Sequence, residues 1–213
     1  MPDRLEWGEV QRHLVSLVPE REPEMRAMEA DAEATGFPII GPAAGQVCYQ
    51  IARLTGARRI FELGSGYGYS TAWFARAVRD NGGGEVFHVV WDKALSKRAR
   101  THLARLGLDS VVRFHVGEAV AALDATDGPF DLIFNDIDKQ GYPGSIPVIE
   151  TKLRSGGVLI ADNALYHGRV FDDGDATPAT GGVREFVRRL TTDPGWSTSL
   201  LPVRDGLLVS LKL

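Results

Sequence analysis

Apolar and polar residues follow two alternating periodicities along most of this chain. From Ala57 onward, short apolar runs of strand length alternate with longer segments whose apolar residues recur at helical spacing. The runs predict strands near residues 58–63, 85–91, 111–116, 130–135 and 157–162, and the longer segments predict helices near 69–79, 94–106, 117–124, 143–153 and 182–192. Strands that alternate with helices form a parallel sheet with helices on both faces. The pattern therefore predicts an α/β fold with a Rossmann-like, doubly wound sheet.

The periodicity changes at the C-terminus. Two further apolar segments, 197–203 and 207–213, flank Arg204-Asp205-Gly206, a short connection that contains the Asp-Gly signal of a β-hairpin. An antiparallel hairpin is therefore expected to close one edge of a mostly parallel sheet, which would then have seven strands. A loop-rich insertion is predicted at residues 171–182, FDDGDATPATGG.

Helical spacing also precedes the first strand. Residues 4–18 predict a short amphipathic helix, residues 23–35 a second helix with a thin apolar face, and residues 44–54 a third. We expect a single domain in which an N-terminal helical extension, 1–36, precedes the core, 37–213. The extension is expected to cover the active site, to join a dimer or to pack on the core, and the sequence does not distinguish these roles. A homodimer is the expected assembly.

The composition fits one soluble domain. With 213 residues, of which 44% are hydrophobic, the chain can bury one sizeable core. Its formal net charge of -4 argues against a broad basic surface that grips nucleic acid. The single cysteine, Cys48, excludes an internal disulfide framework and suits a cytoplasmic location. The N-terminus MPDRLEWGEV lacks a signal pattern, and no apolar run approaches the roughly 20 residues that span a bilayer, so no membrane partner is expected.

A glycine-rich turn follows the first predicted strand, in the sequence FELGSGYGYS at 61–70. Its glycines would let the backbone turn sharply and approach a ligand, in the place where α/β sheets bind nucleotides. The spacing does not match G-x-G-x-x-G, so a tight strand-to-helix connection is the alternative. Glu62, just before the glycines, could accept from an ammonium group or a hydroxyl. The next strand ends in Val90-Trp91-Asp92, so an acid that holds a cofactor's ribose is either Asp92 or missing.

Polar residues also follow the fourth and fifth predicted strands. Asp136, Asp138 and Lys139 come after the apolar run 132–134, and Asp162 and Asn163 come after the fifth strand. The carboxyl ends of parallel strands are where α/β sheets bind ligands, so these side chains are expected to converge. Their oxygens suit a hard cation such as Mg²⁺, Mn²⁺ or Ca²⁺. Solvated loops and turn caps are the alternative interpretation.

The five histidines show no metal-binding spacing. His88, His102 and His115 are interpreted as structural. His167 follows the Asp-Asn pair, and it either lines the substrate entrance or belongs to a surface loop.

Taken together, these motifs resemble those of the class I S-adenosylmethionine (SAM)-dependent, metal-dependent O-methyltransferases of the catechol and caffeoyl-CoA type. The resemblance covers roughly residues 37–213. It rests on four ordered blocks, which are ELGSGYGYS at 62–70, FNDIDKQGY at 134–142, SGGVLIADNALYHGRV at 155–170 and Asp205-Gly206.

The resemblance implies a role for each site residue. SAM would be bound by residues on the ends of four strands, namely Glu62, Gly64, Gly66, Tyr69, Ser70, Asp92, Glu118, Ala119 and Asp136. A divalent cation, Mg²⁺ in the first place and otherwise Mn²⁺ or Ca²⁺, would be held by Asp136, Asp162 and Asn163. Lys139 would be the general base, and Asp136 would act with it in catalysis. Where the family carries the ribose-binding acid this chain has Val90, so Asp92 would have to take its place.

The resemblance also implies the reaction, which is transfer of a methyl group to a hydroxyl of a small catechol-like or hydroxycinnamoyl-type acceptor. The first alternative is methylation of a hydroxylated uridine in tRNA, which would need a basic surface beside the metal site. Candidate basic residues for that surface are scattered in the sequence: Arg53, Arg58, Arg59, Arg76, Arg79, Lys152 and Arg154. The second alternative is a SAM-binding protein without activity, which the departure at Val90 suggests.

Overall fold

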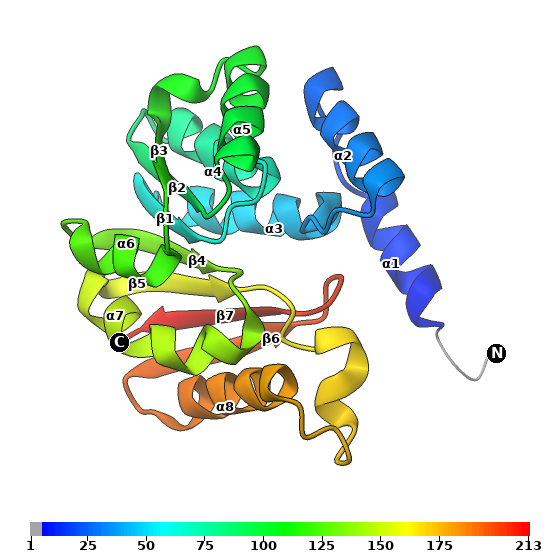
Figure 1. The fold of residues 1–213 in the computed structure, drawn as a ribbon, viewed down its shortest axis with the longest axis vertical. Coiled ribbons are helices and arrows are strands. Elements are labelled where there is room, and N and C mark those ends of the chain that lie inside the picture. Colours follow the sequence, from blue (N-terminus) through cyan, green and yellow to red (C-terminus); the bar gives the residue numbers. More distant parts are fainter. Residues whose placement is uncertain (1–5) are drawn as a thin grey trace.

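Seven strands form one mixed sheet at the centre of the protein, in the order β3-β2-β1-β4-β5-β7-β6 (Figure 1). The structure is a computed structural model that describes residues 6–213, so the part of the predicted helix 4–18 that falls on residues 4 and 5 lies outside the described residues. The strands are β1 (Arg59–Leu63), β2 (Glu85–Val90), β3 (Val112–Val116), β4 (Phe130–Asn135), β5 (Leu153–Ala161), β6 (Trp196–Leu201) and β7 (Leu207–Lys212). β1 to β5 run parallel, and β7 pairs antiparallel with both β5 and β6. The predicted sheet with its C-terminal hairpin is confirmed.

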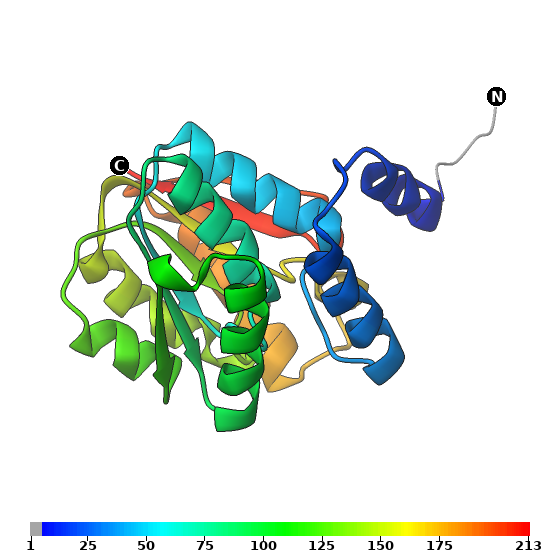
Figure 2. The same ribbon diagram turned by 90° about the horizontal axis from the view of Figure 1, so that it is seen from above.

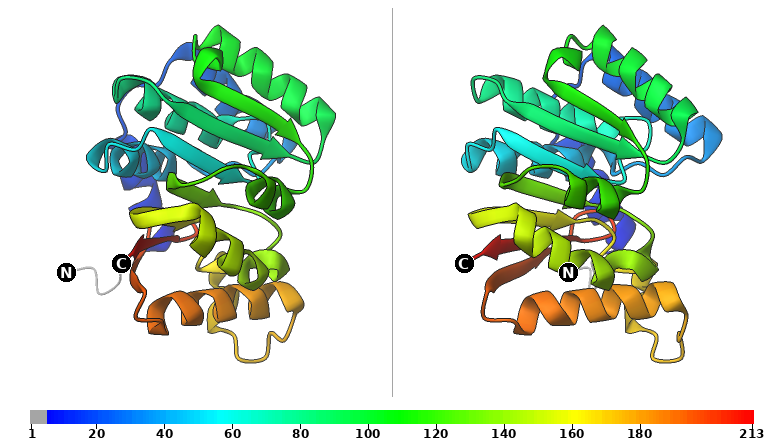
Figure 3. Two further views of the ribbon diagram at one scale, coloured as in Figure 1. Left: turned by 90° about the vertical axis from the view of Figure 1, so that its left-hand side faces the viewer. Right: turned by 60° about the vertical axis from the view of Figure 1, so that its left-hand side comes forward.

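Helices cover both faces of this sheet (Figure 3). They are α1 (Trp7–Ser16), α2 (Pro23–Thr35), α3 (Gly41–Leu54), α4 (Tyr69–Asp80), α5 (Lys93–Arg105), α6 (Ala119–Ala125), α7 (Tyr142–Lys152) and α8 (Pro178–Thr192). Side chains of α2, α3, α4 and α5 join one hydrophobic core, and those of α6, α7 and α8 join a second. None of the helices described is both long and apolar enough to cross a membrane.

The central strands are buried on both faces, which explains their continuous apolar runs. In β4, Leu132 and Phe134 belong to the core shared with α3 and α4, whereas Ile133 between them belongs to the core shared with α7 and α8. In β1, Ile60 and Phe61 divide between the two cores in the same way. This alternation fixes the register of each strand, and with the register it fixes which residues emerge at the carboxyl end of the sheet.

Two predicted boundaries are wrong. The last helix begins at Pro178 rather than at residue 182, inside the predicted insertion, because Thr177-Pro178 supplies a capping position followed by a proline suited to the first turn. β5 begins at Leu153 rather than at residue 157, since the backbone continues through the glycines and Leu153 pairs with Phe130. The ion pair between Arg154 Nε and Asp131 Oδ1, at 2.8 Å, joins this early part of β5 to β4.

The two N-terminal helices differ in how they attach to the core. Met25 and Met28 of α2 are buried in the core shared with α4, which answers one of the open alternatives for that helix. No residue of α1 is buried, and α1 stands apart from the sheet and its helix layers (Figure 2). Its polar link to the core is Gln11, whose Oε1 accepts a hydrogen bond from the backbone N–H of Arg204 at 2.6 Å. The loop before β7 is therefore the place where α1 contacts the functional end of the sheet.

The close contact of α3 with α4 generates a stability prediction. A Cβ atom on Gly45 in α3 would lie 2.2 Å from Nε1 of Trp73, whose indole is fully buried, whereas Gly181 in α8 faces open space. Gly45→Ala should therefore lower the free energy of unfolding by about 1–3 kcal/mol through overpacking. Gly181→Ala should leave it unchanged or raise it by up to about 1 kcal/mol through helix propensity. Urea denaturation measures both, and equal stability of the two variants would contradict this packing.

Candidate active site

The polar residues predicted at the strand ends meet around one cavity of about 630 Å³ at the carboxyl edge of the sheet. Asp136 and Lys139 follow β4, and Asp162 and Asn163 follow β5, which lies next to it in the sheet. All four line the cavity, together with Gly64 after β1. The expected convergence of these side chains is therefore present.

Close backbone approach joins the turn after β1 to the acidic loop after β4. The backbone N–H of Asp136 donates to the carbonyl of Leu63 at 2.8 Å, which extends the pairing of β1 with β4 by one residue. A Cβ atom on Gly64 would lie 2.4 Å from the carbonyl oxygen of Asp136, and Gly64 has φ +87°. Only glycine fits this position, because both the space and the left-handed backbone exclude a side chain. The glycine-rich turn therefore serves to bring the two loops together.

Lys139 lies between the acidic site and α7. Its Nζ donates to Oδ1 of Asp136 at 2.7 Å and to the hydroxyl of Tyr142 at 2.9 Å. The Tyr142 hydroxyl in turn lies 3.0 Å from the carbonyl oxygens of Asn135 and Asp162, so the tyrosine bridges the ends of β4 and β5. Gly182 of α8 packs against the backbone of Lys139 so closely that a Cβ there would lie 2.3 Å from its carbonyl oxygen. These contacts hold the Lys139 ammonium group at the acidic end of the cavity.

Asp138, the other acid of this loop, is exposed at the rim of the cavity. Its backbone carbonyl accepts from Gly141, and its side chain makes no capping hydrogen bond to the short helical turn that follows. The structure therefore gives Asp138 no cap role, one of the roles left open by the sequence.

Asp162 and Asn163 present oxygen atoms to the same cavity. The Asp162 side chain is only 2% exposed, and one of its oxygens, Oδ2, accepts from Nη1 of Arg204 at 3.2 Å. Within residues 6–213 its other oxygen, Oδ1, has no hydrogen-bond partner. Asn163 adopts a left-handed backbone, φ 57°, and its Nδ2 donates to Oδ2 of Asp205 at 2.9 Å. Because the amide nitrogen is bound to Asp205, its carbonyl oxygen remains for another partner.

The two acids of this site hold their protons more tightly than usual. Burial raises the pKa of Asp136, which the nearby Lys139 lowers in part, and burial together with the charge of Asp136 raises the pKa of Asp162 to about 7. Two carboxylates in one poorly solvated place disfavour each other's charge, and an additional positive charge there would stabilise both. Across the described chain, no group of three or more His, Cys, Asp or Glu residues could hold a metal ion. The predicted metal set, two acids and one amide, stays a prediction.

The buried acid Glu62 is part of a hydrogen-bonded chain beneath the glycine-rich turn. It accepts from the hydroxyl of Thr71, and that hydroxyl lies 3.0 Å from Nδ1 of His88 on β2. Burial raises the pKa of Glu62 to about 7, although hydrogen bonds from Ser70, Thr71 and Ser65 work against this rise. Burial lowers the pKa of His88 to about 3, so this imidazole is neutral and its role is structural, as predicted.

Three further residues predicted to bind the cofactor lie around the glycine-rich turn, and they differ in whether their polar groups are already hydrogen-bonded within the protein. Gly66, Tyr69 and Ser70 line a small cavity of about 170 Å³ next to Gly64 and Asp136. The Tyr69 hydroxyl is committed to α2, where it donates to Oε1 of Glu29 at 2.7 Å. Ser70 contacts the Glu62 carboxylate. These residues therefore surround the turn, and only part of their polar surface faces the cavity.

Asp92 and Glu118 act as helix caps in this structure. Asp92 Oδ1 accepts from the backbone N–H of Ala94 at 2.6 Å at the start of α5, and Glu118 accepts from two N–H groups at the start of α6. Neither residue lines the cavity of about 630 Å³ around the acidic residues, whereas Val90 and Ala119 do. The apolar Val90 thus occupies the edge of the cavity at the end of β2.

Three residues that lie at this site were given no site role in the sequence analysis. Arg204 and Asp205 were interpreted as a hairpin turn, and Tyr142 was noted without a role. Arg204 lines the cavity and contacts Asp162, while Asp205 accepts from both the Asn163 side chain and the backbone N–H of His167. The signal in the sequence was Asp205-Gly206, which is one of the four blocks of the family resemblance as well as a hairpin signal.

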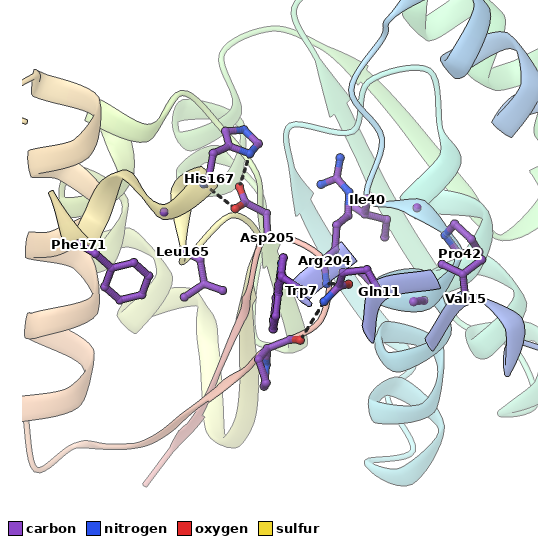
Figure 4. Close-up of a pocket in the computed structure, with 15 residues that line it drawn as sticks. Trp7, Gln11, Val15, Ile40, Pro42, Leu165, His167, Phe171, Arg204 and Asp205 are labelled. Atoms are coloured by element: carbon purple, nitrogen blue, oxygen red, sulfur yellow. Dashed lines mark hydrogen bonds and ion pairs between the residues drawn. The ribbon is translucent and has the colours of Figure 1, made fainter. Parts of the chain in front are cut away.

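A second cavity, of about 850 Å³, adjoins the acidic site (Figure 4). It is lined mainly by apolar residues from α1, the start of α3 and the loops before α8 and β7, including Trp7, Ile40, Pro42, Leu165 and Phe171. His167 and Arg204 line both cavities, so they mark the passage between the two. The His167 side chain is 72% exposed there, which agrees with an entrance position.

Comparison with known proteins shows close similarity across almost the whole chain. Residues 23–213 match the sequence profile of the family described as O-methyltransferase. A catechol O-methyltransferase of Niastella koreensis is 32% identical over 198 residues, which cover 88% of this chain and 88% of that protein. The crystal structure of the O-methyltransferase TomG from Streptomyces achromogenes, in complex with SAM, is 26% identical, has a TM-score of 0.85 and covers 100% of this chain and 99% of its own. An O-methyltransferase from Bacillus cereus, in complex with SAH, is 27% identical, has a TM-score of 0.86 and covers 97% and 98% of the two chains.

The sheet order and the glycine-rich turn after β1 thus define a SAM-dependent methyltransferase. The chain belongs to the O-methyltransferase family, and it is a SAM-dependent enzyme of that class. The predicted family, fold and enzyme class are confirmed. The alternative of a SAM-binding protein without activity is set aside.

The raised pKa of Glu62 generates a prediction about stability and pH. A carboxyl group whose pKa rises from 4.5 to about 7 on folding contributes most stability below pH 4.5, and loses that contribution as the pH rises through 7. Glutamine carries no ionisable proton at this position. The free energy of unfolding of Glu62→Gln, relative to that of wild type, should therefore rise by about 1–3 kcal/mol as the pH is raised from 5 to 8. Urea denaturation of both proteins at the two pH values measures the difference. A gap that does not change with pH would show that Glu62 does not titrate in this range.

Proposed function

We propose that this enzyme transfers a methyl group from SAM to one hydroxyl of a small catechol-like or hydroxycinnamoyl-type acceptor, using a divalent metal and Lys139 as the base. The observation that carries the proposal is the convergence of Asp136, Asp162 and Asn163 beside the Lys139 ammonium group, at the mouth of an apolar cavity. Two carboxylates, an amide oxygen and an amine at one edge of the sheet supply the groups that bind and deprotonate a hydroxyl.

The proposed metal ligands are suited to a hard cation. Asp136 and Asp162 are acids whose pKa is raised, Asp162 has an unpaired Oδ1 within residues 6–213, and the Asn163 amide is oriented by Asp205. Oxygen donors of this kind match Mg²⁺ first, and Mn²⁺ or Ca²⁺ otherwise. A cation bound there would lower the pKa of an acceptor hydroxyl and hold it in place.

As the neutral amine, a form that the positive charge of a cation bound beside it would favour, Lys139 would accept the proton of the acceptor hydroxyl. The Lys139 side chain is 12% exposed, and its Nζ already donates hydrogen bonds to Asp136 and to the Tyr142 hydroxyl. Tyr142 helps to fix Nζ, because its hydroxyl also lies 3.0 Å from two strand-end carbonyl oxygens, those of Asn135 and Asp162. The deprotonated oxygen would then bond to the methyl carbon of SAM while the bond from that carbon to the sulfonium sulfur breaks, which would leave SAH as the second product. Much of the rate would come from alignment, since well-oriented intramolecular reactions reach effective molarities of about 10⁵–10⁸ M.

SAM would lie along the ends of β1, β2 and β3. Gly64, Gly66, Ser70 and Asp136 border this region, and Ala119 lines it from the start of α6. In this proposal Glu62 fixes the turn from below, and Tyr69, Asp92 and Glu118 keep the cofactor contacts expected from the sequence. The structures of TomG in complex with SAM and of the Bacillus cereus protein in complex with SAH support a SAM site in this fold.

The apolar cavity is the proposed acceptor site. Its walls are mainly apolar, with side chains such as Trp7, Leu165 and Phe171, and its polar side chains are Gln11, His167, Arg204 and Asp205. This lining suits an aromatic ring with hydroxyls at one end. The catechol O-methyltransferase of Niastella koreensis supports this class of acceptor.

A hydroxylated uridine in tRNA is the less favoured acceptor. Three of the basic residues that such a function would use, Arg58, Arg59 and Arg154, gather around Asp131 at the amino ends of the strands. The proposed metal ligands follow the carboxyl ends, at the opposite edge of the sheet. The single domain, the homodimer and the cytoplasmic location stay predictions.

The catalytic proposal predicts a shared loss of activity. Methyl transfer to a panel of catechols should require Mg²⁺ and should fall by about 100-fold or more in Lys139→Ala and in Asp136→Ala, since each change removes a group that handles the proton or the cation. Lys97→Ala, which alters an exposed lysine of α5, is the control and should retain activity. Activity that survives chelation and both site substitutions would contradict the mechanism.

The ribose contact proposed for Asp92 can be separated from its cap role. Asp92→Ala should lower stability by about 1 kcal/mol by removing the cap, and it should also weaken SAM binding. Asp92→Asn keeps an equally good cap but removes the charge, so weaker SAM binding by this variant in calorimetry isolates the ribose contact. If Asp92→Asn binds SAM as wild type does, Asp92 is a structural cap and nothing more.

A further inference from the structure

Arg204 brings a permanent positive charge into the acidic site. Its Nη1 lies 3.2 Å from Oδ2 of Asp162, and the side chains are 35% and 2% exposed. A guanidinium group stays protonated throughout the pH range in which the protein is folded. The oxygen that Arg204 contacts belongs to a residue that the proposed function assigns to the metal.

Arg204 occupies this position with a strained backbone conformation. Arg204 has φ 53°, in the left-handed region that disfavours residues with a side chain. Hydrogen bonds on both sides hold that conformation: Gln11 Oε1 accepts from the Arg204 N–H at 2.6 Å, and the backbone N–H of Leu165 donates to the carbonyl of Asp205 at 2.8 Å. A strained residue that its surroundings fix in this way is a candidate for a functional role.

The charges of the site are already matched by groups of the chain itself. Lys139 Nζ lies 2.7 Å from Asp136, and Arg204 Nη1 lies 3.2 Å from Asp162, so each carboxylate has one cationic partner. A divalent cation that takes Asp162 as a ligand meets this guanidinium at the same carboxylate. Two cations at one poorly solvated carboxylate repel each other. A divalent metal that binds Asp162 must therefore either displace the guanidinium or bind more weakly in its presence.

The surroundings of Arg204 offer its guanidinium a second position, away from Asp162. Consecutive side chains diverge here: Asp205 points to His167, whereas Arg204 extends past Ile40 (Figure 4). The stem of Arg204 lies over Gly41, with Cδ 3.7 Å from the place of a Cβ on that glycine. Arg204 lines the acidic cavity and the apolar one alike, so turning away from Asp162 leaves it in the proposed acceptor cavity.

We propose that Arg204 is a resident cation of the acidic site: it holds Asp162 in place when no metal is bound, competes with the divalent metal for that carboxylate, and thereby sets the metal affinity. This inference rests on the metal set of the proposed function. Metal binding releases the guanidinium from Asp162 and places it against the acceptor, so Arg204 links metal loading to the acceptor cavity. Arg204 is a positioning residue in this scheme, since it acts through Asp162.

Titration of the full-length protein with Mn²⁺ alone, followed by calorimetry or by the paramagnetic signal of free Mn²⁺, tests the inference without any activity measurement. Arg204→Gln removes the charge, and it should bind Mn²⁺ at least about tenfold more tightly than wild type. Arg204→Lys keeps the charge and should stay within a few-fold of wild type. Arg188→Gln changes the net charge equally, on an exposed arginine paired with Glu185 in α8, and it should not alter the affinity. Asp162→Asn should lose binding.

The outcomes separate this inference from the function on which it rests. Equal or weaker Mn²⁺ binding by Arg204→Gln, with binding lost in Asp162→Asn, overturns the role of Arg204 and leaves the metal site standing. A gain of the same size in Arg188→Gln also overturns it, because the effect would then be one of net charge. Absence of binding in every protein overturns both the inference and the metal part of the proposed function.

Discussion

Two carboxylates at the ends of neighbouring strands are the constraint around which this site is built. Asp136 and Asp162 follow β4 and β5, which are paired in a parallel sheet, so the fold itself brings their charges together in poorly solvated surroundings. Charges a few ångströms apart under such conditions repel each other by several kcal/mol. Lys139 and Arg204 each reduce this repulsion by pairing with one carboxylate, and the proposed metal would reduce it in the same way. The proposed chemistry depends on this pair of carboxylates, which the sheet places next to each other.

Backbone contacts, rather than side-chain packing, keep the loops of the site in register. The carbonyl of Asp136 lies against Gly64, and the carbonyl of Lys139 lies against Gly182. Each contact leaves no room for a single added carbon. The glycine-rich turn, the acidic loop and α8 are therefore packed directly against one another, and these contacts fix Lys139 relative to the proposed metal ligands.

Hydrophobic periodicity predicted the order of strands and helices, because every central strand is buried on both faces and every helix has one apolar face. The same pattern located Asp136, Lys139, Asp162 and Asn163, since parallel strands end at one edge. Arg204 and Asp205 could not be found in this way. They come from the hairpin connection, and their contacts with Asp162 and Asn163 span 42 residues of sequence, so only the folded sheet brings them together. For Asp92 and Glu118 the sequence could not separate a ligand contact from a helix cap, because both uses require an acid at the same position.

The loose attachment of α1 has a consequence for how acceptors are selected. Trp7 and Val15 form part of the wall of the apolar cavity, yet they belong to a helix with no buried residue. Segments of this kind open locally at little cost in free energy while the rest of the protein stays folded. This wall of the proposed acceptor site is thus separable from the sheet that carries the proposed catalytic residues. Substitutions in α1 can alter which molecules are admitted without disturbing the strand ends, so acceptor range and catalytic competence can diverge independently within this fold.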